Sequence, residues 1–212
     1  MKTRFWQGPE NLSPFSQRHT DTAGFSLIEL MIAMVIATLM LSAVYAVYAS
    51  LTRSYTTQNV SAEVQQNVRA AIDFMAEDLM MAGLDPDAVA DAKFENATAT
   101  NIRFTLDRNL NGTIDDTDEE RVTYSYNGSA LRQCIYEGTP SANWETIVDN
   151  VTGFSLTYLD SSNSTIASPV SATDLSRIRS VVIQITVREP AGRDDLVERT
   201  YTTKIRCRNI GI

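Results

Sequence analysis

Acidic and amide side chains gather in one twelve-residue segment, 107–118, with the spacing of a calcium-binding loop. The expected oxygen ligands are Asp107, Asn109, Asn111, the Thr113 carbonyl, Asp115 (through water) and Asp118. Gly112 permits the sharp turn at the sixth position, and Ile114 is expected to point into the protein and hold the loop. Because hard oxygen ligands favour Ca²⁺, the segment predicts a calcium site.

Two departures separate this segment from a true EF-hand. Its twelfth residue, Asp118, is shorter than the bidentate Glu usual there, although Glu119 or Glu120 can supply the missing oxygen. Its flanks have the alternating pattern of strands and not the periodicity of helices. We therefore expect weak affinity, in the range of about 10⁻⁴–10⁻³ M. The alternative is an acidic hairpin loop that binds no metal.

The residue types that carry most catalysis are sparse. The only histidine, His19, lies in the first 24 residues, which we expect to be removed, so no histidine triad or histidine metal site is expected afterwards. No phosphate loop or dinucleotide fingerprint is present. The net charge is -8, and an acidic protein repels phosphate backbones, so nucleic acid is not an expected partner. The sequence does not predict an enzyme.

The chain has two cysteines, Cys134 and Cys207, which lie far apart and without the spacing of a metal site. In an oxidising extracytoplasmic compartment, a disulfide between them is expected. It would attach the C-terminus to the rest of the β-rich part of the chain. The alternative is two unrelated buried thiols.

An uncharged stretch, 30–52, follows a polar N-terminal segment. As a helix it would extend about 34 Å, enough to cross a bilayer core of about 30 Å. An ordinary secretory signal fits poorly, because the small residues Ala23 and Gly24 come before the apolar run instead of after it. Glu29 stands near the start of this helix, where a carboxylate is costly and points to a function.

The stretch 24–30, Gly-Phe-Ser-Leu-Ile-Glu-Leu, resembles the class III signal of type IV prepilins and pseudopilins. The resemblance implies a leader, 1–24, that a membrane peptidase removes by cutting after Gly24. It also implies N-methylation of the new terminal residue, Phe25, and an assembly role for Glu29, the fifth mature residue. In a fibre, this carboxylate could pair with the Phe25 amine of a neighbour and so fix the axial register. The alternative is a plain signal anchor with a chance Glu.

The helical pattern continues past the membrane stretch. Apolar residues recur at spacings of three and four at Val60, Val64, Val68, Ala71, Ile72, Met75 and Leu79. The positions between them are mostly polar, so the second half of the helix is amphipathic. Gly83 and Pro86 form a strong stop signal. A long helix over 25–83 is therefore expected, with 25–52 in the membrane or fibre core.

Two further stretches resemble one subfamily. Residues 66–83 are similar to the helix of PilW-type minor pilins and, more loosely, to the J-type minor pseudopilins of type II secretion. Residues 148–158 are also PilW-like. The resemblance covers the N-terminal third well and the remainder in patches.

After Pro86 the apolar pattern has period two, which is typical of strands. Strands are expected around 102–106, 122–126, 130–136, 154–158, 178–188 and 196–207, and loops over 87–99 and 160–176. Asn127-Gly128 signals a hairpin turn. The expected fold is pilin-like α+β: a long N-terminal helix packed on an antiparallel sheet of a β-rich domain, 84–212, whose apolar face covers the stripe from Val60 to Leu79.

The expected function is a minor type IV pilin that primes or caps the pilus. Its expected partners are other pilins, the prepilin peptidase and the bacterial inner membrane, with the C-terminal domain in the periplasm and later on the fibre. One alternative is a minor pseudopilin of type II secretion. The other is a tip adhesin whose calcium loop stabilises a binding face.

Overall fold

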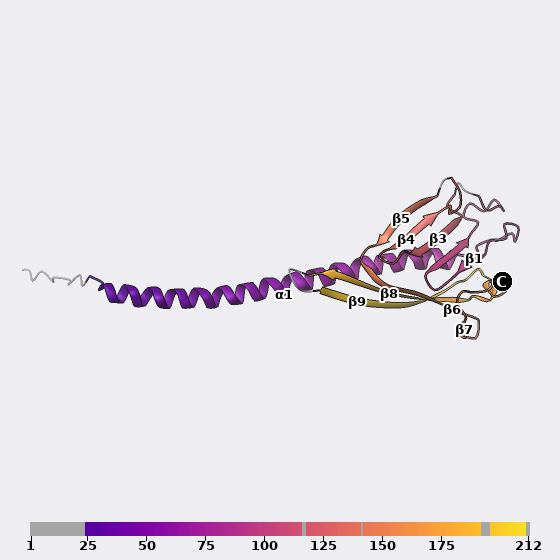
Figure 1. Ribbon diagram of the computed structural model, residues 1–212. Helices are drawn as coiled ribbons and strands as arrows, with labels where there is room; N and C mark the ends of the chain where they lie inside the picture. Colours follow the sequence, from indigo (N-terminus) through magenta and orange to yellow (C-terminus); the bar gives the residue numbers. More distant parts are fainter. Residues whose placement is uncertain (1–23, 116–117, 141, 192–195, 211–212) are drawn as a thin grey trace, which may run out of the picture. The chain divides into compact units, whose positions relative to one another are not determined.

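The computed structural model describes residues 24–115, 118–140, 142–191 and 196–210 (Figure 1). The chain divides into two compact units, Met1–Ala49 and Ser50–Ile212. One helix, α1 (Leu27–Met81), supplies the described structure of the first unit and enters the second. The leader expected over 1–24 lies outside the described residues, except for Gly24.

The end of α1 follows the expected stop signal. Gly83 has φ +76°, a left-handed conformation that glycine adopts without a steric penalty. Its N–H donates to the Thr105 carbonyl at 2.9 Å, and Leu84 N–H donates to Met81 at 2.9 Å. A Cβ on Gly83 would lie 2.3 Å from Ile210 Cδ1. The helix therefore ends where the chain must turn and approach its own C-terminal segment closely.

The second unit contains two antiparallel sheets. The first has the order β1-β2-β3-β4-β5 and the second β7-β6-β8-β9. The strands are β1 (Phe94–Ala97), β2 (Asn101–Thr105), β3 (Arg121–Tyr126), β4 (Leu131–Ile135), β5 (Asn143–Val148), β6 (Val151–Leu159), β7 (Thr165–Ile166), β8 (Ser180–Pro190) and β9 (Leu196–Arg206), with a short 3-10 helix, η1 (Leu175–Arg177), before β8.

The core of this unit joins the second half of α1 to both sheets. The helix buries the stripe expected from the sequence: Val64, Val68, Ala71, Met75 and Leu79. These side chains share one apolar cluster with residues of the first sheet, such as Phe104, and of the second, such as Ile183. The amphipathic period of the sequence thus determines which helix face the sheets cover.

The structure corrects three expectations about the strands. Two sheets are present where one was expected. Strands β1 and β7 and the helix η1 lie inside segments expected to be loops, and β5 was missed. The missed strands are short or lie at a sheet edge, and β5 is mostly exposed, so none shows a clear alternation of apolar residues. The Asn127-Gly128 hairpin is confirmed, because β3 pairs with β4 across it.

Candidate processing and assembly site

The start of α1 is a capping box that places Glu29. Ser26 Oγ accepts a hydrogen bond from Glu29 N–H at 3.3 Å, and Glu29 Oε2 accepts one from Ser26 N–H at 2.8 Å. This reciprocal pair satisfies two backbone donors that a helix start otherwise leaves free. A cap of this kind stabilises a helix by about 0.5–2 kcal/mol. The Ser-x-x-Glu spacing was visible in the sequence but was not recognised there.

The residues at the expected cleavage point are accessible. Phe25 is 90% exposed, and Gly24 is exposed beside it. No atom lies within 4 Å of a Cβ placed on Gly24, so packing within the chain gives no reason for a glycine there. The Glu29 carboxylate lies one helical turn from this point, at the positive end of the helix. It can therefore accept an ion pair from an amine.

The described surface of the first unit is apolar and exposed to solvent. Every described residue from Gly24 to Ala49 is exposed, including Leu30, Val35, Leu39 and Val44. Within α1, an 18-residue window has a mean hydropathy of 2.4, so the helix is long and apolar enough to cross a membrane. An apolar surface of this extent is normally covered by lipid or by other helices.

The acidic loop is organised around two buried carboxylates. Asp107 is 1% exposed, and its two oxygens accept from Asn111 N–H (3.1 Å) and Gly112 N–H (2.9 Å). Glu120 is fully buried, and its oxygens accept from the N–H groups of Arg108 (3.0 Å) and Asp115 (2.9 Å). These bonds close the loop from both ends, and Glu120 is a more central residue than the sequence alone indicated.

The other expected calcium ligands bond to one another; Asp115 is half-buried, and Asn109, Asn111, Thr113 and Asp118 are exposed. Asn109 Nδ2 donates to Asp118 Oδ2 at 2.5 Å, and Asn111 Nδ2 donates to Asp115 Oδ2 at 3.3 Å. Thr113 bonds to Asn111 Oδ1 through both its N–H and its hydroxyl. The described residues contain no group of three or more acidic, histidine or cysteine side chains placed to hold a metal ion. Residues 116 and 117 of this loop lie outside the described residues.

A buried polar network connects the loop to the helix. Tyr124 Oη donates to Asp78 Oδ2 at 2.6 Å, and Gln133 Nε2 donates to the same oxygen at 3.2 Å. Arg108, from the acidic loop, lies 3.8 Å from Asp78 Oδ1. Burial raises the pKa of Asp78, although the Tyr124 hydrogen bond and the Arg108 charge oppose this. No local sequence pattern indicates that this polar residue is buried on the apolar helix face.

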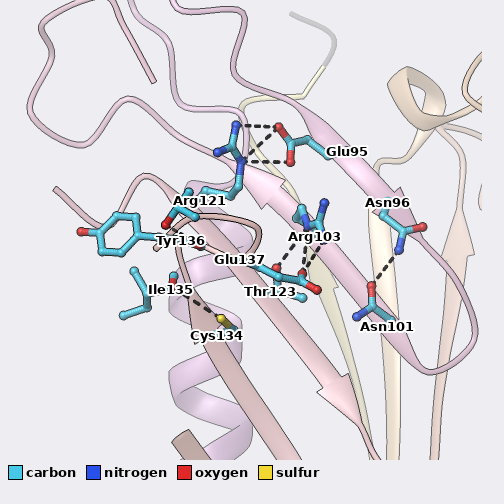
Figure 2. Close-up of polar contacts among 11 residues, drawn as sticks. Glu95, Asn96, Asn101, Arg103, Arg121, Thr123, Cys134, Ile135, Tyr136 and Glu137 are labelled. Atoms are coloured by element: carbon cyan, nitrogen blue, oxygen red, sulfur yellow. Dashed lines mark hydrogen bonds and ion pairs between the residues drawn. The ribbon is translucent and has the colours of Figure 1, made fainter. Parts of the chain in front are cut away.

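The expected disulfide is wrong for this structure, in which Cys134 and Cys207 are both free and buried. Gln133 points to Asp78 of the helix, so its neighbour Cys134 points to the opposite face of the first sheet. There it lies beside the ion pair of Arg103 and Glu137 (Figure 2). Cys207 instead belongs to the apolar core.

Burial also governs the chemistry of the two thiols. It raises the pKa of the Cys134 thiol, with a further contribution from the Glu137 charge. It raises the pKa of Cys207 to about 12. Because the thiolate is the reactive form, neither thiol is activated for nucleophilic chemistry.

Comparisons with known family models identify the family of this chain. The family model described as prepilin peptidase-dependent protein B matches residues 57–207, well over half of the chain. The prokaryotic N-terminal methylation motif matches residues 20–45. Among solved structures, a type IV-like pilin from Thermus thermophilus is similar, with 12% identity and a TM-score of 0.49 over 70% of this chain and 98% of that one. No curated protein matches. The resemblance to type IV pilin-like prepilins is confirmed.

Proposed function

Because the chain belongs to the prepilin peptidase-dependent protein B family, we propose that it is a minor type IV pilin that primes or caps pilus assembly. The observation that carries the proposal is the N-terminal methylation motif, whose Glu29 is held by a capping box at the start of an exposed apolar helix. Pilin-like families are structural, and the proposed role needs no catalysis by this chain.

The proposed sequence of events begins in the inner membrane. The prepilin peptidase cuts between Gly24 and Phe25, and the new amine of Phe25 is methylated. The C-terminal unit lies in the periplasm while α1 crosses the bilayer once. During assembly the helix leaves the lipid and packs against the helices of other pilins, which cover its exposed apolar side chains.

In this proposal, Glu29 sets the axial register between neighbouring subunits of the fibre. In the isolated chain its carboxylate accepts the Ser26 N–H. In the fibre it pairs with the methylated amine of a neighbouring subunit, because an unpaired charge inside an apolar bundle is costly. Removing one partner of a buried pair costs about 3–5 kcal/mol, so a Glu29 substitution should block incorporation without blocking cleavage.

The experiment compares fibres and membranes from the native host after gene deletion and complementation. Glu29→Gln should be processed normally but reach sheared pili at less than about a tenth of the wild-type amount. The matched control is Glu63→Gln, an exposed position farther along the same helix, which should assemble normally. Normal pili with lost protein secretion would instead indicate a minor pseudopilin, and normal pili with lost attachment would indicate an adhesin.

We further propose that the loop 107–120 binds Ca²⁺ weakly. Its ligands would be Asp107, Asn109, Asn111, the Thr113 carbonyl, Asp115 and Asp118, with Glu120 as a further carboxylate. The donor set fits a hard cation in kind, since it consists of carboxylate, amide and carbonyl oxygens. Two carboxylates buried together, with no Lys or Arg among the described residues within 4.0 Å of either, are a reason to expect a cation there.

Thermal unfolding tests the calcium proposal. With a Kd of about 0.5 mM, 5 mM Ca²⁺ would stabilise the fold by about 1.4 kcal/mol and raise the Tm by about 3–6 °C. Asp118→Asn should abolish this rise, whereas Asp149→Asn, at another exposed acidic position, should preserve it. A Tm that stays constant at millimolar Ca²⁺ would contradict the proposal.

A further inference from the structure

A groove of about 700 Å³ follows the outer strand of the second sheet. Its walls include Ala76 and Met80 of α1, the consecutive residues 203–208, and Ile210. Neighbouring residues of a strand point to opposite faces of its sheet. Because four consecutive strand residues, 203–206, line the groove, it is not confined to one face of the sheet, and we place it along the strand edge, where the backbone is reached. It also extends to Arg179, just before β8.

The edge along this groove is open. Strand β9 has 11 residues and pairs with β8 on one side, and no described strand pairs with it on the other (Figure 1). Outside the sheet pairing itself, the backbone hydrogen bonds of the described residues include none from residues 196–206. Such an edge presents alternate N–H and C=O groups that can accept another strand.

The rim of the groove is basic, although the whole chain carries a net charge of -8. Arg179, Lys204, Arg206 and Arg208 all line it. Arg206 and Arg208 are exposed, and no carboxylate oxygen of the described residues lies within 4.0 Å of either guanidinium. The apolar residues of the lining are Ala76, Met80, Ile205 and Ile210, of which Ile205 and Ile210 are buried.

These three properties describe a particular kind of occupant. An open strand edge takes an extended backbone, a basic rim takes acidic side chains, and the apolar part of the lining takes the side chains that alternate with them. Of the lining residues, 203–206 belong to β9 and span about 13 Å of strand. We propose that the groove is a docking site for an extended segment of another protein, with alternating acidic and apolar residues, that adds to the sheet beside β9.

The docking site belongs to the second unit, whereas the proposed fibre contacts use residues 25–52, the apolar half of α1. It can therefore be tested even if the assignment to a pilus is wrong. The basic residues also oppose unselective pairing at this edge, since charged side chains are a common protection of open strands.

The test uses the full mature chain in non-ionic detergent micelles and fluorescein-labelled ten-residue peptides. The probe alternates Val and Glu. One control peptide alternates Val and Lys, and a second replaces every Val by Pro, which removes backbone donors while keeping the charge. Fluorescence anisotropy should show saturable binding of the Val-Glu peptide alone, and the affinity should fall as salt is raised.

Two variants separate the groove from general electrostatics. Arg206→Glu combined with Arg208→Glu should weaken binding by about tenfold. Arg69→Glu combined with Lys93→Glu makes the same change in net charge at exposed positions outside both the groove and β9, and should leave the affinity unchanged. Unchanged Trp144 fluorescence would show that each variant is folded.

Hydrogen exchange then tests the strand itself. Bound peptide should slow the exchange of backbone amides within residues 202–206. Equal binding of the Glu-Pro peptide, or displacement by inorganic phosphate without amide protection, would show a simple anion site and overturn the proposal. Absence of binding, or self-association of the chain through β9 before any peptide is added, would also overturn it.

Discussion

Replacing Asp78 by alanine should lower the free energy of unfolding by about 1–3 kcal/mol. Asp78 Oδ2 is the shared acceptor of Tyr124 Oη at 2.6 Å and Gln133 Nε2 at 3.2 Å. Tyr124 is fully buried, so its hydroxyl cannot turn to water when the carboxylate is removed. Gln133 also donates to Tyr124 Oη at 3.1 Å, so it keeps one acceptor, and the main loss comes from the tyrosine.

Further variants test whether the loss of stability comes from the hydrogen bond between Asp78 and Tyr124. Tyr124→Phe removes the donor and should cost about 1 kcal/mol. The double variant should cost less than the sum of the single variants by about 1 kcal/mol, because both then lose the same hydrogen bond. Asp78→Asn keeps an acceptor oxygen, so it should lower the free energy of unfolding by less than Asp78→Ala does. Asp73→Ala, exposed on the same helix, should change stability by less than about 0.5 kcal/mol.

Urea unfolding of the mature chain in detergent micelles provides the assay. Trp144 is the natural probe, because the only other tryptophan, Trp6, lies within residues 1–24, the proposed leader, and is absent from the proposed mature chain. An Asp78→Ala cost no larger than that of Asp73→Ala, or a coupling energy of zero between positions 78 and 124, would refute the reasoning.

The pH dependence has a definite sign. Burial raises the folded-state pKa of Asp78 above its unfolded value of about 3.9. Between these two pKa values the folded state holds the extra proton, so the contribution of Asp78 to stability falls as pH rises through that window. Asp78→Asn cannot titrate there. The wild type should therefore lose stability relative to this variant as pH rises above about 4, and the opposite trend in urea midpoints would contradict the account.

Two other predictions concern the end of the helix and the cysteines. Gly83→Ala should lower the free energy of unfolding by about 1–2 kcal/mol, because alanine is strained at the positive φ of this position. The loss should exceed that of Gly128→Ala, since a Cβ at 83 also meets Ile210, whereas a Cβ at 128 has no atom within 4 Å. Equal shifts in the urea midpoint would contradict this prediction. Cys134 and Cys207 should resist iodoacetamide at pH 8 in the folded chain, and both should react after unfolding without reductant. A disulfide-linked peptide containing residues 134 and 207 in a proteolytic digest would contradict this prediction.

Much of the helix was predictable because its signals are local. The uncharged stretch 30–52, the stripe beginning at Val60 and the stop at Gly83 each depend on neighbouring residues only. Longer strands with clear alternation, such as β8, were predictable for the same reason. The start at Ser26 was also within reach, since the capping-box spacing is a sequence pattern.

The features that were missed depend on tertiary contacts. Asp78 can interrupt the apolar face of the helix only because Tyr124 and Gln133 come from a sheet to meet it. The error about Cys134 has a similar origin: a shift of one position in a strand moves a side chain to the other face, and sequence spacing does not define that face. Strand β5 depends on its partner β4 and not on its own pattern.

The most direct test of the central claim is mass spectrometry of the N-terminal peptide from membranes and sheared fibres of the native host. The account predicts a peptide that begins at N-methyl-Phe25, present in fibres at a small fraction of the main subunit, and absent when the prepilin peptidase gene is deleted. A chain that keeps residues 1–24 in the presence of the peptidase would contradict the account.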